Sequence, residues 1–167
     1  MTARAGTLPE GVRSVRWEGP DGYWASDDRR LVDRAWVHAW LTQEAYWALG
    51  RPYAVVDRSI DHSLVIGLYA PSGEQVGFAR WVTDFATFGW LSDVFVSTAH
   101  QGDGLGSFLV QAAISHPAIR DARLVLATAP VRTLYRRHGF EPLQSPERWM
   151  ERRPGPSVAP DREDPSL

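Results

Sequence analysis

The sequence predicts one domain of the mixed α/β, or α+β, class, built on a central, mostly antiparallel sheet. Its 167 residues are 44% hydrophobic and 23% charged, as expected for a soluble globular domain. Apolar residues recur at helical spacing in two stretches and alternate as in strands between them. Short turn sequences join the alternating segments and a helix joins the last ones, so the sheet should combine hairpins with a crossover connection.

The two ends of the chain lack the pattern of a packed domain. Residues 1–12 mix Thr, Gly, Pro and Ala without periodicity, which predicts a flexible N-terminal arm. Residues 154–167 are polar and proline-rich, which predicts a disordered tail. The domain itself is therefore expected to span residues 13–153.

The domain is expected to open with a strand, near residues 12–17 or 22–24, and then a helix. Ser26-Asp27-Asp28 favours a helix start, because side-chain oxygens there accept hydrogen bonds from the first amides. The apolar stripe that follows at helical spacing consists of Leu31, Val32, Ala35, Trp36, Ala39 and Trp40.

Two further helices are expected before the main strands of the sheet. Thr42 can cap a short helix that ends at Gly50, where glycine favours termination. Pro52 suits the first turn of a second helix, which ends before Leu64.

Three consecutive strands form the centre of the expected sheet. Residues 64–69 are an apolar run, ended by the turn sequence Pro71-Ser72-Gly73. Residues 76–84 alternate between two faces, and residues 88–96 follow after a short link. The short links predict antiparallel pairing.

The helical period returns after Gly106 and is closed by His116-Pro117. Beyond this helix we expect a buried strand at 124–127, a helix at 131–138, and final strands at 140–143 and 149–151.

Missing residue types exclude several chemistries. The absence of cysteine removes zinc–thiolate sites, disulfides and thiol nucleophiles. All 18 basic residues are arginine, so a Walker lysine, a pyridoxal Schiff base and a lysine nucleophile are excluded. The five histidines lack the close spacing of metal ligands, and we therefore expect no metal.

The net charge and the hydropathy of the chain indicate which binding partners and which cellular location to expect. The net charge of −2 argues against a nucleic-acid partner. The sequence contains no run of 18 consecutive apolar residues, so no membrane span is expected. The N-terminus lacks the apolar region of a signal peptide. A cytoplasmic protein without membrane association is expected.

The stretch that indicates a binding site lies between the third central strand and the second long helix. Glycines at 102, 104 and 106 allow close approach of a ligand to the backbone. A helix N-terminus adds free amides and a positive dipole end, which together favour a phosphate or pyrophosphate. A dinucleotide fingerprint fails because Leu109 stands where it needs glycine, whereas a glycine-rich turn that only starts a helix remains the alternative.

The spacing Gln101-x-x-Gly104-x-Gly106 resembles the Q/R-x-x-G-x-G/A signature of the GNAT superfamily of acyl-CoA-dependent N-acyltransferases. Some thirty residues later, Leu134-Tyr-Arg-Arg-His-Gly-Phe140 is similar to the L-Y-x-x-x-G-F segment of the same family. The strand at 124–127 lies between the two, as the family order requires. The resemblance covers roughly residues 64–151 and implies a GNAT-like sheet with splayed central strands and helices on both faces.

The resemblance implies a role for specific residues. It makes Tyr135 the general acid that protonates the departing CoA thiolate, for which a phenol with a pKa near 10 is chemically suited. A tyrosine that only anchors the sheet is the other interpretation. The residues that it implies for binding acetyl-CoA, through pantetheine or pyrophosphate, are Val94, Phe95, Val96, Gln101, Gly102, Asp103, Gly104, Gly106 and Ser107.

Two positions depart from the family pattern. Asp103 places a carboxylate beside the expected pyrophosphate, where the family often has a basic residue. Thr128 follows the strand at 124–127 where the family often has an asparagine, and we include it among the residues that contact substrate.

The general base is expected to be a carboxylate or a chain of water molecules, because an alkylammonium must lose its proton before it attacks. Asp93 is the leading candidate and Asp84 the alternative, although either could be an ordinary strand-end carboxylate. Strand alternation places the side chains of Asp93 and Val94 on opposite faces unless a bulge intervenes.

An excess of aromatic residues suggests a pocket for the acceptor amine, although tryptophans are more often core residues. Trp47 lies beside a predicted helix end, where exposure is common. The residues expected to line this pocket are Tyr46, Trp47, Arg51 and Trp81.

Together these features predict an acetyl-CoA-dependent N-acetyltransferase that acts on a primary amine of a small molecule through a ternary complex. The alternatives are a non-catalytic CoA-binding sensor or partner domain, and an acetyltransferase that acts on protein N-termini or side chains. Homodimer formation is left open.

Overall fold

The computed structural model describes residues 8–129 and 131–152. Most of the predicted arm and all of the predicted tail lie outside this part of the chain. The strands are β1 (Arg16–Glu18), β2 (Trp24–Ser26), β3 (Leu64–Tyr69), β4 (Gln75–Thr83), β5 (Phe88–Val96) and β6 (Arg123–Leu126). The α-helices are α1 (Arg34–Gln43), α2 (Tyr53–Asp61), α3 (Leu105–Ile114) and α4 (Arg132–Arg137).

The strands form one six-stranded sheet in the order β1-β2-β3-β4-β5-β6. All neighbours pair antiparallel except β5 and β6, which are parallel. This arrangement confirms the predicted mixed class with a mostly antiparallel sheet. The β5–β6 ladder ends at the pair Leu91 and Leu126, while β5 continues to Val96. The two strands therefore separate over residues 92–96.

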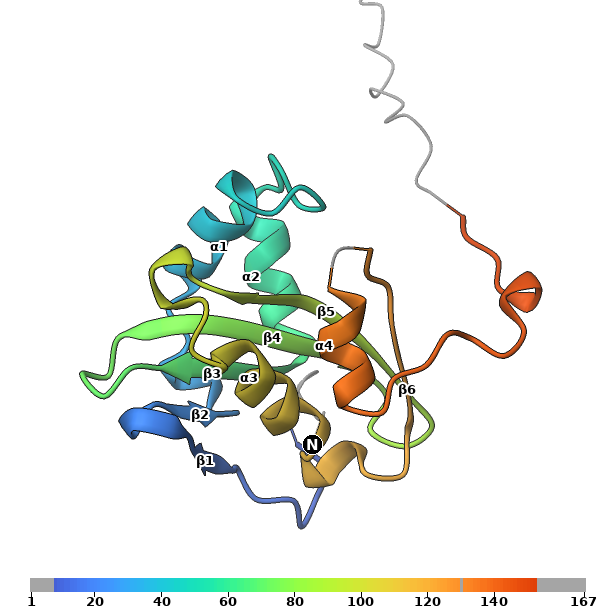
Figure 1. Cartoon of the computed structure of the whole chain (residues 1–167), viewed down its shortest axis with the longest axis horizontal. Helices are drawn as coiled ribbons and strands as arrows, with labels where there is room; N and C mark the ends of the chain where they lie inside the picture. Colours follow the sequence, from blue (N-terminus) through green and yellow to red (C-terminus); the bar gives the residue numbers. More distant parts are fainter. Residues whose placement is uncertain (1–7, 130, 153–167) are drawn as a thin grey trace, which may run out of the picture.

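Helices cover both faces of the sheet, and each face has its own apolar core. Figure 1 shows α3 and α4 on the near side of the sheet and α2 behind it. On the α3 face, Leu105 and Leu109 pack with Trp81 and Leu91. On the α1–α2 face, Val37 and Ile60 pack with strand residues, namely Val65, Phe78 and Phe95. The longest helices of the described chain, α1 and α3, have 10 residues each, too few to span a membrane.

The first helix begins later than the sequence predicts. Asp33 caps α1 by accepting a hydrogen bond from the amide of Trp36 at 2.9 Å. Asp28 instead caps a short 3₁₀ turn before it. The predicted helix capped by Thr42 is absent, because the Thr42 hydroxyl bonds back to the carbonyl of His38 and residues 44–52 form a loop.

The predicted strands at 140–143 and 149–151 are also wrong. Both segments are described, and neither is a strand. Pro142, within the first segment, lacks the amide that a ladder along β6 would need. Residues 140–143 instead line a cavity together with residues 125–128.

A buried pair joins the N-terminal hairpin to the segment after α3. Asp27 Oδ2 accepts a hydrogen bond from His116 Nε2 at 2.8 Å, and both side chains are fully buried. His116 Nδ1 accepts from the amide of Ala118, which leaves the ring proton on Nε2. Asp27 Oδ1 accepts from the Ser14 hydroxyl and the Val15 amide. Burial acts to raise the pKa of Asp27, but these hydrogen bonds outweigh it and hold the pKa below its usual value.

Because the pKa of Asp27 is lower in the folded state, its ionisation stabilises the fold above about pH 4, and this contribution is lost as the pH falls further. We expect Asp27→Asn to lower the free energy of unfolding at pH 7 by about 1–3 kcal/mol, since an amide cannot accept from all three donors. Urea denaturation at pH 7 and pH 3 checks this. The difference in the free energy of unfolding between wild type and variant should be smaller at pH 3 than at pH 7. An equal difference at both pH values would show that ionised Asp27 does not stabilise the fold.

Candidate active site

The glycine-containing loop before α3 presents a row of free backbone amides. Among the described residues, no hydrogen bond uses the amides of residues 102–107, and the first α3 amide with a partner is that of Phe108. Gln101 ties the loop to the end of β5, because its side-chain amide donates to the Val96 carbonyl at 2.9 Å. The helix N-terminus and these amides form a site suited to an anion.

The backbone conformation of this loop depends on glycine. Gly104 precedes α3 at φ 75°, and Gly102 has φ 102°, both in the left-handed region. A Cβ built on either residue would meet nothing within 4 Å, so a side chain at either position would project into open space. The Asp103 side chain between them is exposed and forms no ion pair within the described residues.

Helix α4 lies against the first turn of α3, beside this loop. The Ser107 hydroxyl is 2.8 Å from His138 Nε2, and His138 Nδ1 is 3.2 Å from Gln111 Oε1. The glutamine oxygen requires a proton on Nδ1, so Nε2 accepts from Ser107. Burial and neighbouring Arg137 lower the pKa of His138, which favours this neutral form.

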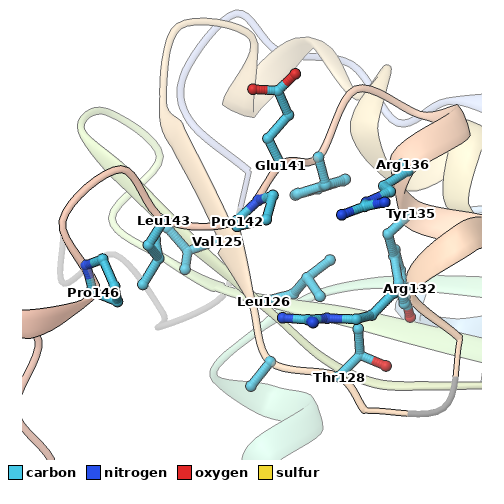
Figure 2. Close-up of a pocket in the computed structure, with 12 residues that line it drawn as sticks. Val125, Leu126, Thr128, Arg132, Tyr135, Arg136, Glu141, Pro142, Leu143 and Pro146 are labelled. Atoms are coloured by element: carbon cyan, nitrogen blue, oxygen red, sulfur yellow. The ribbon is translucent and has the colours of Figure 1, made fainter.

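Tyr135 of α4 is buried and lines a cavity of about 430 Å³ between β6, α4 and residues 140–146. Burial raises the pKa of its hydroxyl, which therefore stays protonated at neutral pH. Figure 2 shows the Tyr135 side chain running toward Thr128, which lines the same cavity. The structure thus brings Tyr135 and Thr128 together.

A β-bulge lies at Asp93, where β5 leaves the regular β4 ladder. Phe78 pairs with Phe95 and Arg80 pairs with Ser92, so β5 has one residue more than β4 between the two pairs. Asp93 has φ 50°, unusual for a residue other than glycine. Val94 packs in the α3-side core and Phe95 in the α1–α2 core, whereas Asp93 contacts the α1–α2 loop.

The carboxylate of Asp93 is 1% exposed and is held by three side chains. Arg80 Nε lies 2.7 Å from Oδ2, Arg51 Nη1 lies 3.1 Å from Oδ2, and Trp47 Nε1 donates to Oδ1 at 3.2 Å. Trp47 and Arg51 were both predicted to contact the acceptor, and they meet at this carboxylate. Tyr46 lies beside them, with its ring edge-on to that of Trp47.

Two sequence predictions lie away from these groups. Trp81 is fully buried under α3, and its indole N–H donates a hydrogen bond to the Ala113 carbonyl. It therefore belongs to the core and cannot line a pocket. Asp84, the alternative base, stabilises the turn between β4 and β5 by accepting hydrogen bonds within it. Hydrogen bonds from Thr87 and from the amides of residues 86–88 lower its pKa.

Two residues of the site were missed in the sequence. Arg80 stands among apolar residues on one face of β4, and a buried arginine needs a carboxylate partner, which was an available signal. His138 lies within the L-Y-x-x-x-G-F segment, but its contact with Ser107 depends on how α4 packs, which the sequence does not reveal.

Comparison with known proteins identifies the family. The sequence model of the acetyltransferase (GNAT) domain matches residues 61–142. A crystal structure from Xanthomonas campestris pv. campestris, assigned as a GNAT-family acetyltransferase, is 41% identical, with a TM-score of 0.77 over 81% of this chain and 95% of that one. The chain belongs to the GNAT acetyltransferase family. It is thus an acyltransferase with the GNAT fold, as the two motifs predict.

Two further proteins are similar to this chain. A Gibberella zeae protein assigned as an acetyltransferase is 30% identical in an alignment over 118 residues, and the match covers 60% of this chain and 66% of that protein. The chain thus spans just under two thirds of that relative. A structure from Clostridium acetobutylicum, assigned as an acetyltransferase and determined with acetyl-CoA, shares the fold at 12% identity, with a TM-score of 0.59 over 78% of this chain and 94% of that one.

Proposed function

We propose that this GNAT protein transfers an acetyl group from acetyl-CoA directly to a primary amine of a small molecule, in a ternary complex. The observation that carries the proposal is the row of free amides at residues 102–107, next to the helix that bears Tyr135. The amides suit the pyrophosphate of CoA, and the separation of β5 from β6 leaves the edge of residues 94–96 available to pantetheine. The relative whose structure contains acetyl-CoA supports the same donor.

In this mechanism Tyr135 supplies the proton that the leaving group needs. The amine nitrogen forms a bond to the acyl carbon, the carbon–sulfur bond breaks, and the Tyr135 hydroxyl donates to the sulfur. Tyr135 suits this role because burial keeps the phenol protonated, and no hydrogen bond within the described residues engages its hydroxyl. We propose that Thr128, which lines the same cavity, contacts substrate.

The amine must also lose a proton, and Asp93 was the predicted acceptor. Its two oxygens are occupied by Arg51, Arg80 and Trp47, which leaves little room for a substrate amine. We therefore propose that Asp93 positions Arg51 and Trp47 on the acceptor side. Water then takes the amine proton, the other route that the sequence left open.

A thiol-release assay tests the proposed function. Acetyl-CoA is mixed with the protein and a panel of small primary amines, and free CoA thiol is followed. We expect thiol release only when an amine is present, because transfer is direct and no acyl-enzyme forms. Binding of acetyl-CoA without turnover of any amine would favour a non-catalytic CoA-binding protein, and turnover of peptides alone would favour a protein acetyltransferase.

Asp103 should weaken the binding of CoA, because its carboxylate lies in the loop that receives the pyrophosphate. We expect Asp103→Asn to tighten CoA binding about two- to fivefold at low salt, the usual scale for one charge at a helix end. Calorimetry at low and high salt measures this, and screening should reduce the gain. Weaker binding in the variant would show that Asp103 shapes the loop instead.

A further inference from the structure

The charges around Asp93 do not balance. Two guanidinium groups, Arg51 and Arg80, pair with this one carboxylate, so the cluster carries a net charge of +1. Among the described residues, Asp93 is the ion-pair partner of both arginines. A site with one surplus positive charge, next to residues 44–52 where the acceptor amine is proposed to bind, favours a ligand with one negative charge.

Of the two arginines, Arg51 is the one available to a ligand, because each nitrogen of Arg80 already has a hydrogen-bond partner. Arg80 Nε bonds Asp93, Nη1 bonds the Ser63 hydroxyl at 3.1 Å, and Nη2 lies 3.3 Å from the Ser92 hydroxyl. All three nitrogens of Arg80 therefore have partners. Its side chain is only 12% exposed.

Arg51 is engaged through one nitrogen only. Its Nη1 contacts Asp93, while Nε and Nη2 have no hydrogen-bond partner within the described residues. The side chain is 24% exposed, so this part of the group can be reached from solvent. A hydrogen bond from His38 to the Arg51 carbonyl holds the backbone of the loop in place. A guanidinium held in this way offers a planar set of donors suited to a carboxylate.

Exposed aromatic rings lie next to this guanidinium. Trp47 shares Asp93 as a hydrogen-bond acceptor with Arg51, and Tyr46 packs against Trp47 with ring centres 5.0 Å apart. Both rings are exposed. They offer an apolar surface beside the charge, which suits an aromatic or aliphatic body attached to an anionic group.

We infer that the acceptor is an amine that carries a carboxylate, bound by Arg51, with its apolar part against Trp47. This inference rests on the proposed function, because it takes residues 44–52 as the acceptor side. Asp93 directly precedes Val94 in the region where β5 separates from β6. A carboxylate on Arg51 thus places the rest of the acceptor near that opening. One negative charge matches the surplus of +1, whereas a phosphate monoester would exceed it.

The test compares two probes that differ only in charge, 4-(aminomethyl)benzoate and 4-(aminomethyl)benzamide. Calorimetry on the CoA-saturated protein measures the binding of each without turnover. We expect the carboxylate to bind at least tenfold more tightly than the carboxamide, as for a charge-assisted hydrogen bond. Equal binding of the two probes, or no binding of either, would overturn the inference.

Three variants assign the preference to Arg51. Arg51→Gln should reduce the ratio of the two affinities to near one, and Arg51→Lys should retain part of it, because a cation remains. Arg58→Gln removes an exposed arginine from α2 and should leave the ratio unchanged. A full preference in Arg51→Gln would contradict the inference, provided that its melting temperature shows a folded protein.

Failure of this inference is distinct from failure of the proposed function. If the thiol-release assay shows turnover of uncharged amines while the carboxylate probe has no advantage, only the assignment of Arg51 fails. If the probe binds as expected and no amine is acetylated, the proposed function fails and the anion site remains.

Discussion

Tyr135→Phe is expected to lower the turnover number of acetyl transfer by about 10²-fold or more while acetyl-CoA affinity changes little. The variant keeps the ring and its edge-on contact with Phe140 but removes the proton that the thiolate receives. Thiol release gives the turnover number, and calorimetry gives the affinity.

Tyr69→Phe is the matched control for this loss. Tyr69 is also buried, and its hydroxyl has no hydrogen-bond partner in the described structure. Its replacement should leave the turnover number unchanged. A fully active Tyr135→Phe would show that water or another group protonates the sulfur, and that Tyr135 serves the fold alone.

Asp93→Asn should lower the free energy of unfolding by about 3–5 kcal/mol, the usual cost of removing one partner from a buried ion pair. Arg51 and Arg80 would then face each other without a counter-charge. If Asp93 only positions Arg51 and Trp47, the variant should raise the KM for the amine more than it lowers kcat. A fall in kcat alone, with loss of the pH dependence of the rate, would instead identify Asp93 as the base. Chemical denaturation and steady-state kinetics provide both readouts.

Two further variants make this result specific. Asp57→Asn removes a half-exposed carboxylate that pairs with Arg34, and it should cost no more than about 1 kcal/mol. The double variant Asp93→Asn/Arg51→Gln should recover part of the lost stability, because it removes one of the two uncompensated charges. If the single and double variants are equally unstable, Arg51 and Asp93 do not interact.

The features that were predicted correctly depend on patterns of residues that are close together in the sequence. The period of apolar residues predicts a helix after Gly106 that is closed by His116-Pro117, and α3 spans Leu105–Ile114. Alternation and turn sequences place β3, β4 and β5 to within a residue or two. In each case neighbouring residues carry the signal, because helix and strand periods are local properties.

The features that were missed depend on pairings between distant segments. Asp27 looks like a helix cap in the sequence, yet it pairs with His116, 89 positions away. The bulge at Asp93 follows from the register between β4 and β5, and this register determines which face its carboxylate reaches. The excess of aromatic residues in the chain suggested Trp81 as a pocket residue, but the packing of α3 buries it. No local pattern distinguishes these outcomes.

The most direct test of the central claim is calorimetry of acetyl-CoA with the wild-type protein, Gly104→Val and Gly73→Val. Gly73 also has a positive φ, at 89°, and open space around it, but it lies in the β3–β4 turn, so it controls for backbone strain. We predict that wild type and Gly73→Val bind acetyl-CoA alike and that Gly104→Val binds at least about tenfold more weakly, since its side chain would fill the space in front of the amides. Wild-type affinity in Gly104→Val, or no binding by the wild type, would contradict the account.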